Sequence, residues 1–286
     1  MAAAGLGLPR SLFGWPADPD RTRLEDWAAT LRRERLCRAG VPLGRAAVRV
    51  GELAAGTPYE PHTLEAYLRA GGGAAGPEPL TLSLTRFDCV TLMEACLAVG
   101  RVAAGGKPSW QRFGAEVERM RYRGGARQGY ASRLHYFSEW IADGERRGLV
   151  GDVGVELGAV EDRRPLRFMT GHRESYPALA DESVFRNIAA VERTLDAQPR
   201  RVVPTARIPA VLDRIETGDV LAFATAIPGL DVTHAAFAYR DAGGTLRVLH
   251  APLAGGVIEV TGVTLPQYVS AIGRATGILV ARPLRA

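Results

Sequence analysis

The chain has 286 residues, of which 47% are hydrophobic and 23% charged, and its formal net charge is +5. This composition is that of an ordinary globular protein and excludes an intrinsically disordered chain, and no long apolar run indicates a membrane-spanning helix. The positive charge comes from arginines spread along the chain rather than from a basic block interleaved with aromatic residues, so nucleic acid is not an expected partner.

Three cysteines, Cys37, Cys89 and Cys96, are an odd number without CxxC spacing. They therefore predict neither a disulfide scaffold nor a cysteine zinc site. The first ten residues lack the basic region and the apolar core of a secretory signal, which favours a cytoplasmic protein unless the annotated start has lost a leader. The compartment and the oligomeric state are not determined by the sequence.

Helical patterns dominate the first two thirds of the chain. An irregular arm over residues 10–20 precedes two amphipathic helices, and a glycine-rich insertion precedes an extended segment at 80–84. Short strands and loops are expected over residues 150–182. The predicted helices cover residues 24–36, 43–54, 110–122, 130–140 and 183–195, with one more that begins near residue 89.

Beyond Pro199 the pattern changes to short β-type runs separated by Gly, Pro and Asp turns, with a hairpin connection at residues 241–244. These runs cover residues 202–203, 220–223, 235–239, 246–249, 257–260 and 277–280. They predict an antiparallel sheet or a partly closed barrel. Helices first and a sheet second give an α+β fold.

Cys89 lies where a polar loop turns into an apolar helix, with Thr85 or Asp88 available as the N-cap. The free backbone N–H groups of a first helical turn favour a thiolate, so we expect a lowered pKa for Cys89. Cys96, seven residues further along the same helix, has no such terminus and is expected to be a small buried hydrophobe.

His234 and His250 are candidates to assist that cysteine. They stand across one predicted hairpin, so they can lie on neighbouring strands with their side chains on one face. A thiol nucleophile needs a base and a third group that orients the base, and Cys89, His234 and His250 satisfy this requirement.

A second polar group lies in the predicted helix 130–140. Leu134, Phe137, Trp140 and Ile141 can bury, which leaves Arg133, His135 and Tyr136 to point toward a cleft, although Tyr136 could equally pack beneath the helix.

Several uncommon strings occur in one order along residues 45–283. They include Phe87-Asp88-Cys89-Val90-Thr91, Tyr130 to Phe137, Phe168-Met169-Thr170, Gly229 to His234 and Leu249-His250-Ala251. In these strings the chain resembles the N-acetylmuramoyl-L-alanine amidase-like family of bacterial proteins, within the NlpC/p60 superfamily of papain-like cell-wall hydrolases. Leu92 and Ala235-Ala236 depart from the expected pattern, which affects the shape of the pocket rather than the chemistry.

The resemblance implies a papain-like core over residues 45–286, preceded by an N-terminal arm and helix over residues 1–44. It implies that Cys89 is the nucleophile, His234 the base and His250 the orienting residue in hydrolysis of an amide bond in murein peptides. No cofactor or metal is implied, and the partner is peptidoglycan. The expected substrate-binding residues are Asp88, Arg133, His135, Tyr136, Thr170 and Asp231, although helix capping is the simpler role for Asp88.

Three alternatives stay open. A metal-dependent hydrolase could use His172, Asp231, His234 and His250, although no HExxH motif or tight ligand spacing occurs. A non-catalytic module could bind wall peptides in the same cleft, and an acyltransferase could use the same fold. The sequence does not choose between the lactyl–L-alanine bond and the bond that follows D-glutamate.

Overall fold

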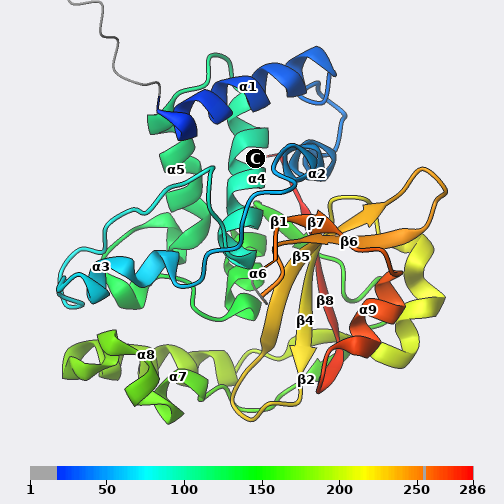
Figure 1. The fold of residues 1–286 in the computed structure, drawn as a ribbon. Helices are drawn as coiled ribbons and strands as arrows, with labels where there is room; N and C mark the ends of the chain where they lie inside the picture. Colours follow the sequence, from blue (N-terminus) through cyan, green and yellow to red (C-terminus); the bar gives the residue numbers. More distant parts are fainter. Residues whose placement is uncertain (1–17, 254–255, 286) are drawn as a thin grey trace, which may run out of the picture.

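The computed structural model describes residues 18–253 and 256–285, so residues 10–17 of the predicted arm lie outside the described residues. Figure 1 shows one group of helices, with α1, α2, α4 and α5 close together, and a twisted sheet beside it. The helices of the described chain are α1 (Pro19–Arg33), α2 (Leu43–Leu53), α3 (Ala66–Arg69), α4 (Cys89–Ala104), α5 (Trp110–Arg121), α6 (Phe137–Arg146), α7 (Phe168–Gly171), α8 (Glu182–Asp196) and α9 (Leu265–Ala271).

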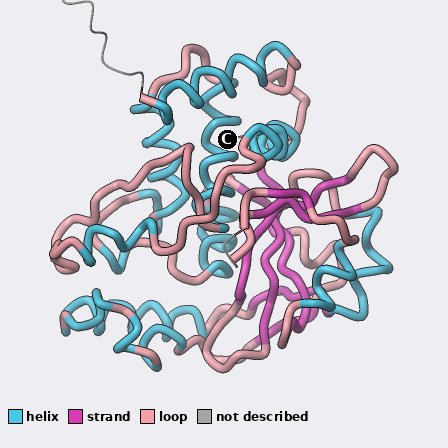
Figure 2. Tube along the Cα trace, viewed as in Figure 1, coloured by secondary structure: helices cyan, strands magenta, loops and turns pink. Residues whose placement is uncertain are grey.

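The sheet is antiparallel at every strand pair, with the order β2-β3-β8-β4-β5-β6-β7 and with β1 also paired to β8. Its two end strands do not pair, so the sheet is open rather than a barrel. The predicted α+β class and the predicted hairpin between β5 and β6 are confirmed (Figure 2). The strands are β1 (Val150–Asp152), β2 (Val160–Asp162), β3 (Arg200–Pro204), β4 (Val220–Thr225), β5 (Val232–Arg240), β6 (Leu246–His250), β7 (Glu259–Val260) and β8 (Ala275–Pro283).

Both faces of the sheet are covered by apolar side chains. On one face, Ala235 and Phe237 of β5 belong to the same buried cluster as residues of α1, α2 and α4. On the other face, Phe223 of β4 packs with Leu265 and Val269 of α9. This alternation is the period-two pattern of a strand that is buried on both sides. The sheet therefore packs on the cysteine helix with one face and on α9 with the other.

Cys96 is in the interior of α4 and is 1% exposed, as expected for a small hydrophobic residue. Its neighbours in the buried cluster include Leu31 of α1 and Val50 of α2. The predicted N-terminal helix therefore packs directly on the helix that begins with Cys89.

The helix predicted over residues 130–140 is wrong in its first half. A 3-10 turn covers Tyr130–Ser132, an extended stretch follows, and α6 begins only at Phe137. Arg133 pairs with Tyr122 in an isolated β-bridge, and its guanidinium is held by carboxylates from another segment. These tertiary contacts outweigh the local helical pattern.

No helix in the described ranges combines the length and the apolar character that a membrane crossing requires.

Candidate active site

Cys89 is the first residue of α4, and a complete capping box holds it there. Oδ1 of Asp88 accepts hydrogen bonds from the backbone N–H groups of Val90 at 3.0 Å and Thr91 at 2.8 Å. The hydroxyl of Thr91 in turn accepts the backbone N–H of Asp88 at 2.9 Å. These bonds satisfy donors that a helix start leaves free, and they fix the backbone on both sides of Cys89. The capping role predicted for Asp88 is therefore confirmed.

The thiol of Cys89 faces β5 and two tyrosines. The backbone N–H groups of Ala235, which follows His234, and of Val90 and Cys89 lie near enough to the sulfur to lower the pKa of the thiol. The pKa values of Tyr59 and Tyr268 are both raised to about 12. Burial is the main cause, and the second cause is the negative charge that Cys89 carries as a thiolate. The sulfur therefore lies within electrostatic reach of both phenols.

The pKa of Cys89 does not follow the expectation from its place in a helix. Burial first and the negative charge of Asp88 second raise the pKa of this thiol to about 12, although the backbone N–H groups act in the opposite direction. The prediction of a lowered pKa is therefore wrong for the substrate-free protein. Desolvation of the thiolate and its acidic neighbour outweigh the amides of the helix start.

His234 and His250 meet as the hairpin pattern predicted. Nε2 of His234 lies 2.9 Å from Nδ1 of His250, and the two rings stand edge to face with centroids 5.1 Å apart. His234 is on β5 opposite Phe223 of β4, and its ring stacks on that phenyl ring at an interplanar angle of 11°. His234, the candidate base, is thus packed against β4 on one side and hydrogen-bonded to His250 of β6 on the other.

Tyr268 of α9 contributes to the orientation of this pair. Its hydroxyl lies 3.3 Å from Nδ1 of His250, and its ring packs on both Phe223 and His250. If Nδ1 of His250 accepts from Nε2–H of His234, then Nδ1 of His234 carries a lone pair. This is the tautomer that a general base needs.

Both histidines are neutral at ordinary pH. Burial lowers the pKa of His234 to about 3, with a further contribution from His250, and burial lowers the pKa of His250 to about 4. Nδ1 of His234 and Nε2 of His250 are buried and have no hydrogen-bond partner among the described residues. Each histidine therefore keeps one ring nitrogen available to a ligand or to the thiol.

A cavity of about 580 Å³ opens beside the histidine pair. This volume is within the range of small-molecule sites in proteins. Its lining comes from β5, from the segment after β6, from the region around β7 and from α9. The lining residues are Thr233, His234, His250, Pro252, Leu253, Glu259, Thr261, Gly262, Val263, Tyr268, Ile272 and Gly273.

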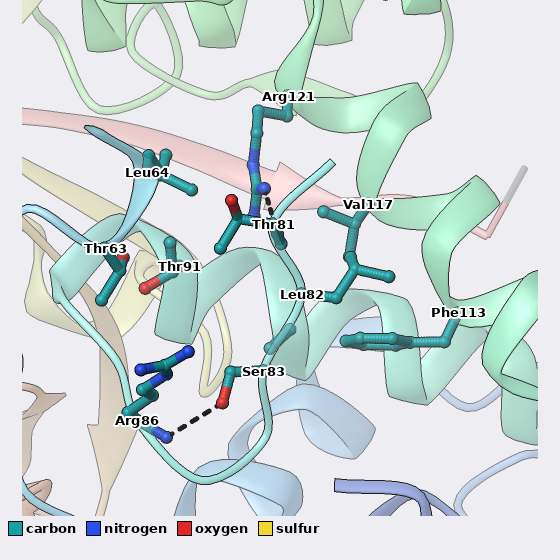
Figure 3. A pocket seen from close by; sticks show the side chains of 11 residues that line it. Thr63, Leu64, Thr81, Leu82, Ser83, Arg86, Thr91, Phe113, Val117 and Arg121 are labelled. Atoms are coloured by element: carbon teal, nitrogen blue, oxygen red, sulfur yellow. Dashed lines mark hydrogen bonds between the residues drawn. The ribbon is translucent and has the colours of Figure 1, made fainter. Parts of the chain in front are cut away.

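The opposite side of the first turn of α4 offers no comparable space. Figure 3 shows the hollow there, between Thr63 and Thr91 on one side and Phe113 and Val117 on the other. Its volume is about 10 Å³, about that of one water-sized probe. A substrate therefore has room beside the histidines rather than behind the cysteine helix.

Arg133 and His135 are held by contacts within the protein. Arg133 is buried and pairs with Glu65 at 3.1 Å and with Glu78 at 3.4 Å, and these carboxylates help to raise its pKa despite burial. Nε2 of His135 lies 2.8 Å from the carbonyl oxygen of Tyr130, and burial, reinforced by Arg133, lowers its pKa well below the usual value. Their predicted role in substrate binding stays a prediction.

Tyr136 and Thr170 meet at one buried carboxylate, which the sequence analysis did not single out. Tyr136 donates its hydroxyl proton to Glu192 at 2.6 Å, and the backbone N–H and the hydroxyl of Thr170 also bond Glu192. Asp231, also buried, accepts from the backbone and the hydroxyl of Ser138, both at 2.8 Å. These bonds give all three side chains structural partners.

The four residues of the metal-site alternative do not gather. His172 is exposed, and its Nδ1 bonds the carbonyl oxygen of Phe168 at 2.7 Å. Over residues 18–253 and 256–285, no three His, Cys, Asp or Glu side chains form a group that could hold a metal ion.

Tyr59 and Tyr268 are the site residues that sequence reasoning missed. Tyr59 falls in the Gly-Thr-Pro-Tyr break, which has the signature of a turn, and Tyr268 falls in a seven-residue helix capped by Thr264. No periodicity separates such tyrosines from packing residues, because only the tertiary fold brings them to Cys89 and His250.

Comparison with known proteins finds solved structures that are similar along most of the chain. A crystal structure of an N-acetylmuramoyl-L-alanine amidase from Bacteroides uniformis is 32% identical, with a TM-score of 0.76, and the alignment covers 84% of this chain and 98% of that one. A Bacteroides fragilis protein described as a candidate xylanase is also 32% identical, with a TM-score of 0.73 and coverage of 82% and 99%.

A more distant structure shares the fold. A Legionella pneumophila protein is 16% identical, with a TM-score of 0.66 and coverage of 92% of this chain and 94% of that one. No curated protein matches the sequence. Residues 49–277, the greater part of the chain, match the sequence profile described as AmiA-like, N-acetylmuramoyl-L-alanine amidase-like. The chain belongs to the N-acetylmuramoyl-L-alanine amidase-like family.

Proposed function

We propose that this protein is a cysteine-dependent amidase of the NlpC/p60 type that hydrolyses an amide bond in bacterial cell-wall peptides. The observation that carries the proposal is the bonded His234–His250 pair, with Nδ1 of His234 unpartnered, on the strand that contacts the Cys89 thiol. The murein substrate and the amide bond are taken from the family and from the named amidase of Bacteroides uniformis.

The chemistry begins with a neutral thiol and a neutral imidazole. Nδ1 of His234 removes the proton from Cys89 as the sulfur attacks the scissile carbonyl carbon, and His250 holds the ring of His234 in place. The backbone N–H of Cys89, free at the start of α4, can donate to the oxyanion. Tyr59, whose pKa is raised to about 12, stays protonated and can donate a second hydrogen bond.

The acyl-enzyme then forms and is hydrolysed. The C–N bond breaks, a thioester joins the acyl group to Cys89, and His234 gives the proton to the leaving nitrogen. Water attacks the thioester with His234 again as base, which restores the thiol.

An amide substrate fits the site better than a glycoside does. Glycosidases generally place two carboxyl groups on either side of the scissile bond. Glu259 is the single carboxylate among the residues that line the cavity beside the histidines. The described lining of this cavity therefore lacks the pair of carboxyl groups that a xylanase, the activity given for the Bacteroides fragilis relative, would use.

Mass spectrometry of digested murein fragments tests the proposal, because it reports both the reaction type and the bond. We expect a free amine and a free acid at one amide bond, loss of cleavage after thiol alkylation, and cleavage that survives a chelator. A ligated product would instead show acyl transfer. A wild-type protein that binds murein peptides under reducing conditions without cleaving them would show a binding module.

A further inference from the structure

The geometry points to the cavity beside His234 and His250 as the subsite for the leaving, amine half of the substrate, with Glu259 disfavouring anionic leaving groups. This inference rests on the proposed function, because it identifies which half of the substrate lies beside the histidines. The cavity holds about 580 Å³, and His234 forms part of its wall.

The proton transfer through His234 indicates that the amine half of the substrate lies on the cavity side of the site. When the C–N bond breaks, the electron pair goes to nitrogen, and the proton that His234 took from Cys89 passes to that nitrogen. The leaving nitrogen must therefore approach His234 within hydrogen-bond reach. The rest of the leaving group extends away from the thioester, and the open space next to His234 is this cavity.

The charge of the lining selects against anions. Glu259 is 53% exposed in its side chain, and its Oε1 lies 3.8 Å from Nε2 of His250. No Arg or Lys is among the lining residues, although the chain carries 36 of them. His234 and His250 are neutral, so the described lining has a net negative charge.

Three buried polar atoms of the lining residues have no partner within the described chain. They are Oγ1 of Thr233, Nε2 of His250 and Nδ1 of His234, the atom that takes the proton in the proposed reaction. In the tautomer in which Nδ1 of His250 accepts from His234, its Nε2–H is a donor, and a hydroxyl can donate or accept. Leu253, Val263 and Ile272 provide apolar wall for the side chains of a bound peptide.

Two muramoyl dipeptides that differ only in charge test the inference. Cleavage at the lactyl–L-alanine bond releases L-alanyl-D-glutamate from one and L-alanyl-D-isoglutamine from the other; the second has an amide in place of the α-carboxylate and so carries one negative charge fewer. At a half-exposed carboxylate, one unit of like charge is worth a two- to fivefold difference, so we expect kcat/KM to favour the isoglutamine substrate by about that factor. Glu259→Gln should remove the preference, and Glu259→Lys should reverse it.

Glu161→Gln is the matched control, because Glu161 is on a strand, is 57% exposed in its side chain and does not line the cavity. It should leave the preference unchanged. An unchanged preference in both Glu259 variants would overturn the inference, as would equal cleavage of both substrates by the wild type.

Binding measurements separate this inference from the proposed function. Calorimetry with Cys89→Ala and the two released dipeptides requires no cleavage. A tighter Kd for L-alanyl-D-isoglutamine that depends on Glu259 supports the subsite even if the wild type cleaves neither substrate. If neither dipeptide binds while the wild type cleaves the intact substrates, the proposed function stands and the subsite is wrong.

Discussion

The ionisation state of Cys89 before substrate binds can be measured by its rate of alkylation. Only the thiolate reacts appreciably, and the pKa of Cys89 is raised to about 12 by burial and by Asp88. At pH 7 a thiol with this pKa is about 10⁻⁵ thiolate, whereas an ordinary cysteine with a pKa of about 8.5 is about 3% thiolate. Cys89 should therefore react about 10³-fold more slowly than a free thiol.

The pH profile gives the sign of the effect. Deprotonation becomes more favourable as pH rises, so the alkylation rate should increase about tenfold per pH unit between about pH 6 and pH 10. Iodoacetamide labelling followed by peptide mapping reports Cys89 separately from Cys37 and Cys96. Asp88→Asn keeps a side chain that can cap α4 but removes the charge, so at a given pH this variant should react faster.

A different profile would refute the reasoning. A rate that is already high and independent of pH between 5 and 8 would mean that a thiolate–imidazolium pair exists without substrate. An unchanged rate in Asp88→Asn would mean that the carboxylate does not act on the sulfur.

Three further variants test the site. Cys89→Ala should abolish amide cleavage, whereas Cys37→Ala and Cys96→Ala should retain it, and equal loss in all three would indicate a structural effect. Tyr268→Phe removes the hydroxyl that lies 3.3 Å from Nδ1 of His250, so kcat should fall about 2- to 12-fold with little change in KM. An unchanged pH–rate profile would count against orientation of His250 by this hydroxyl. Asp88→Ala removes the cap of α4 and should cost about 0.5–2 kcal/mol of unfolding free energy, measured by urea denaturation, while an unchanged midpoint would mean that the cap contributes nothing.

Much of the fold could be predicted because the relevant signals are local. The N-cap before Cys89 and the Asp-Ala-Gly-Gly turn of the β5–β6 hairpin depend on a few neighbouring residues. The hairpin then brings His234 and His250 together, because a tight turn sets the register of the two strands. The order of the strands had no such signal, since β8 pairs with β3, β4 and β1 across long stretches of chain.

The residues predicted to bind substrate show where local signals end. Arg133 and Tyr136 are polar side chains in an irregular segment, and Thr170 lies in the four-residue helix α7. Polar residues in such short elements are typical of a cleft and equally of buried polar contacts. Which of the two applies depends on distant partners: Glu65 and Glu78 reach Arg133, and Glu192 reaches the other two. Sequence spacing carries no information about such pairings.

The pKa values of the two central residues constrain how the enzyme can work. The pKa of the Cys89 thiol is raised and that of the His234 imidazole is lowered, and both directions favour the neutral pair. A thiolate formed before attack would be costly in this buried setting, because each charge is desolvated. In the proposed mechanism, proton transfer to His234 therefore accompanies formation of the carbon–sulfur bond, when the negative charge moves to the oxyanion and reaches the donors there. The neutral pair and the N–H of Cys89 at the start of α4 are thus compatible: burial keeps the resting thiol protonated, and in the proposed mechanism this N–H stabilises the charge only after it has moved to the substrate.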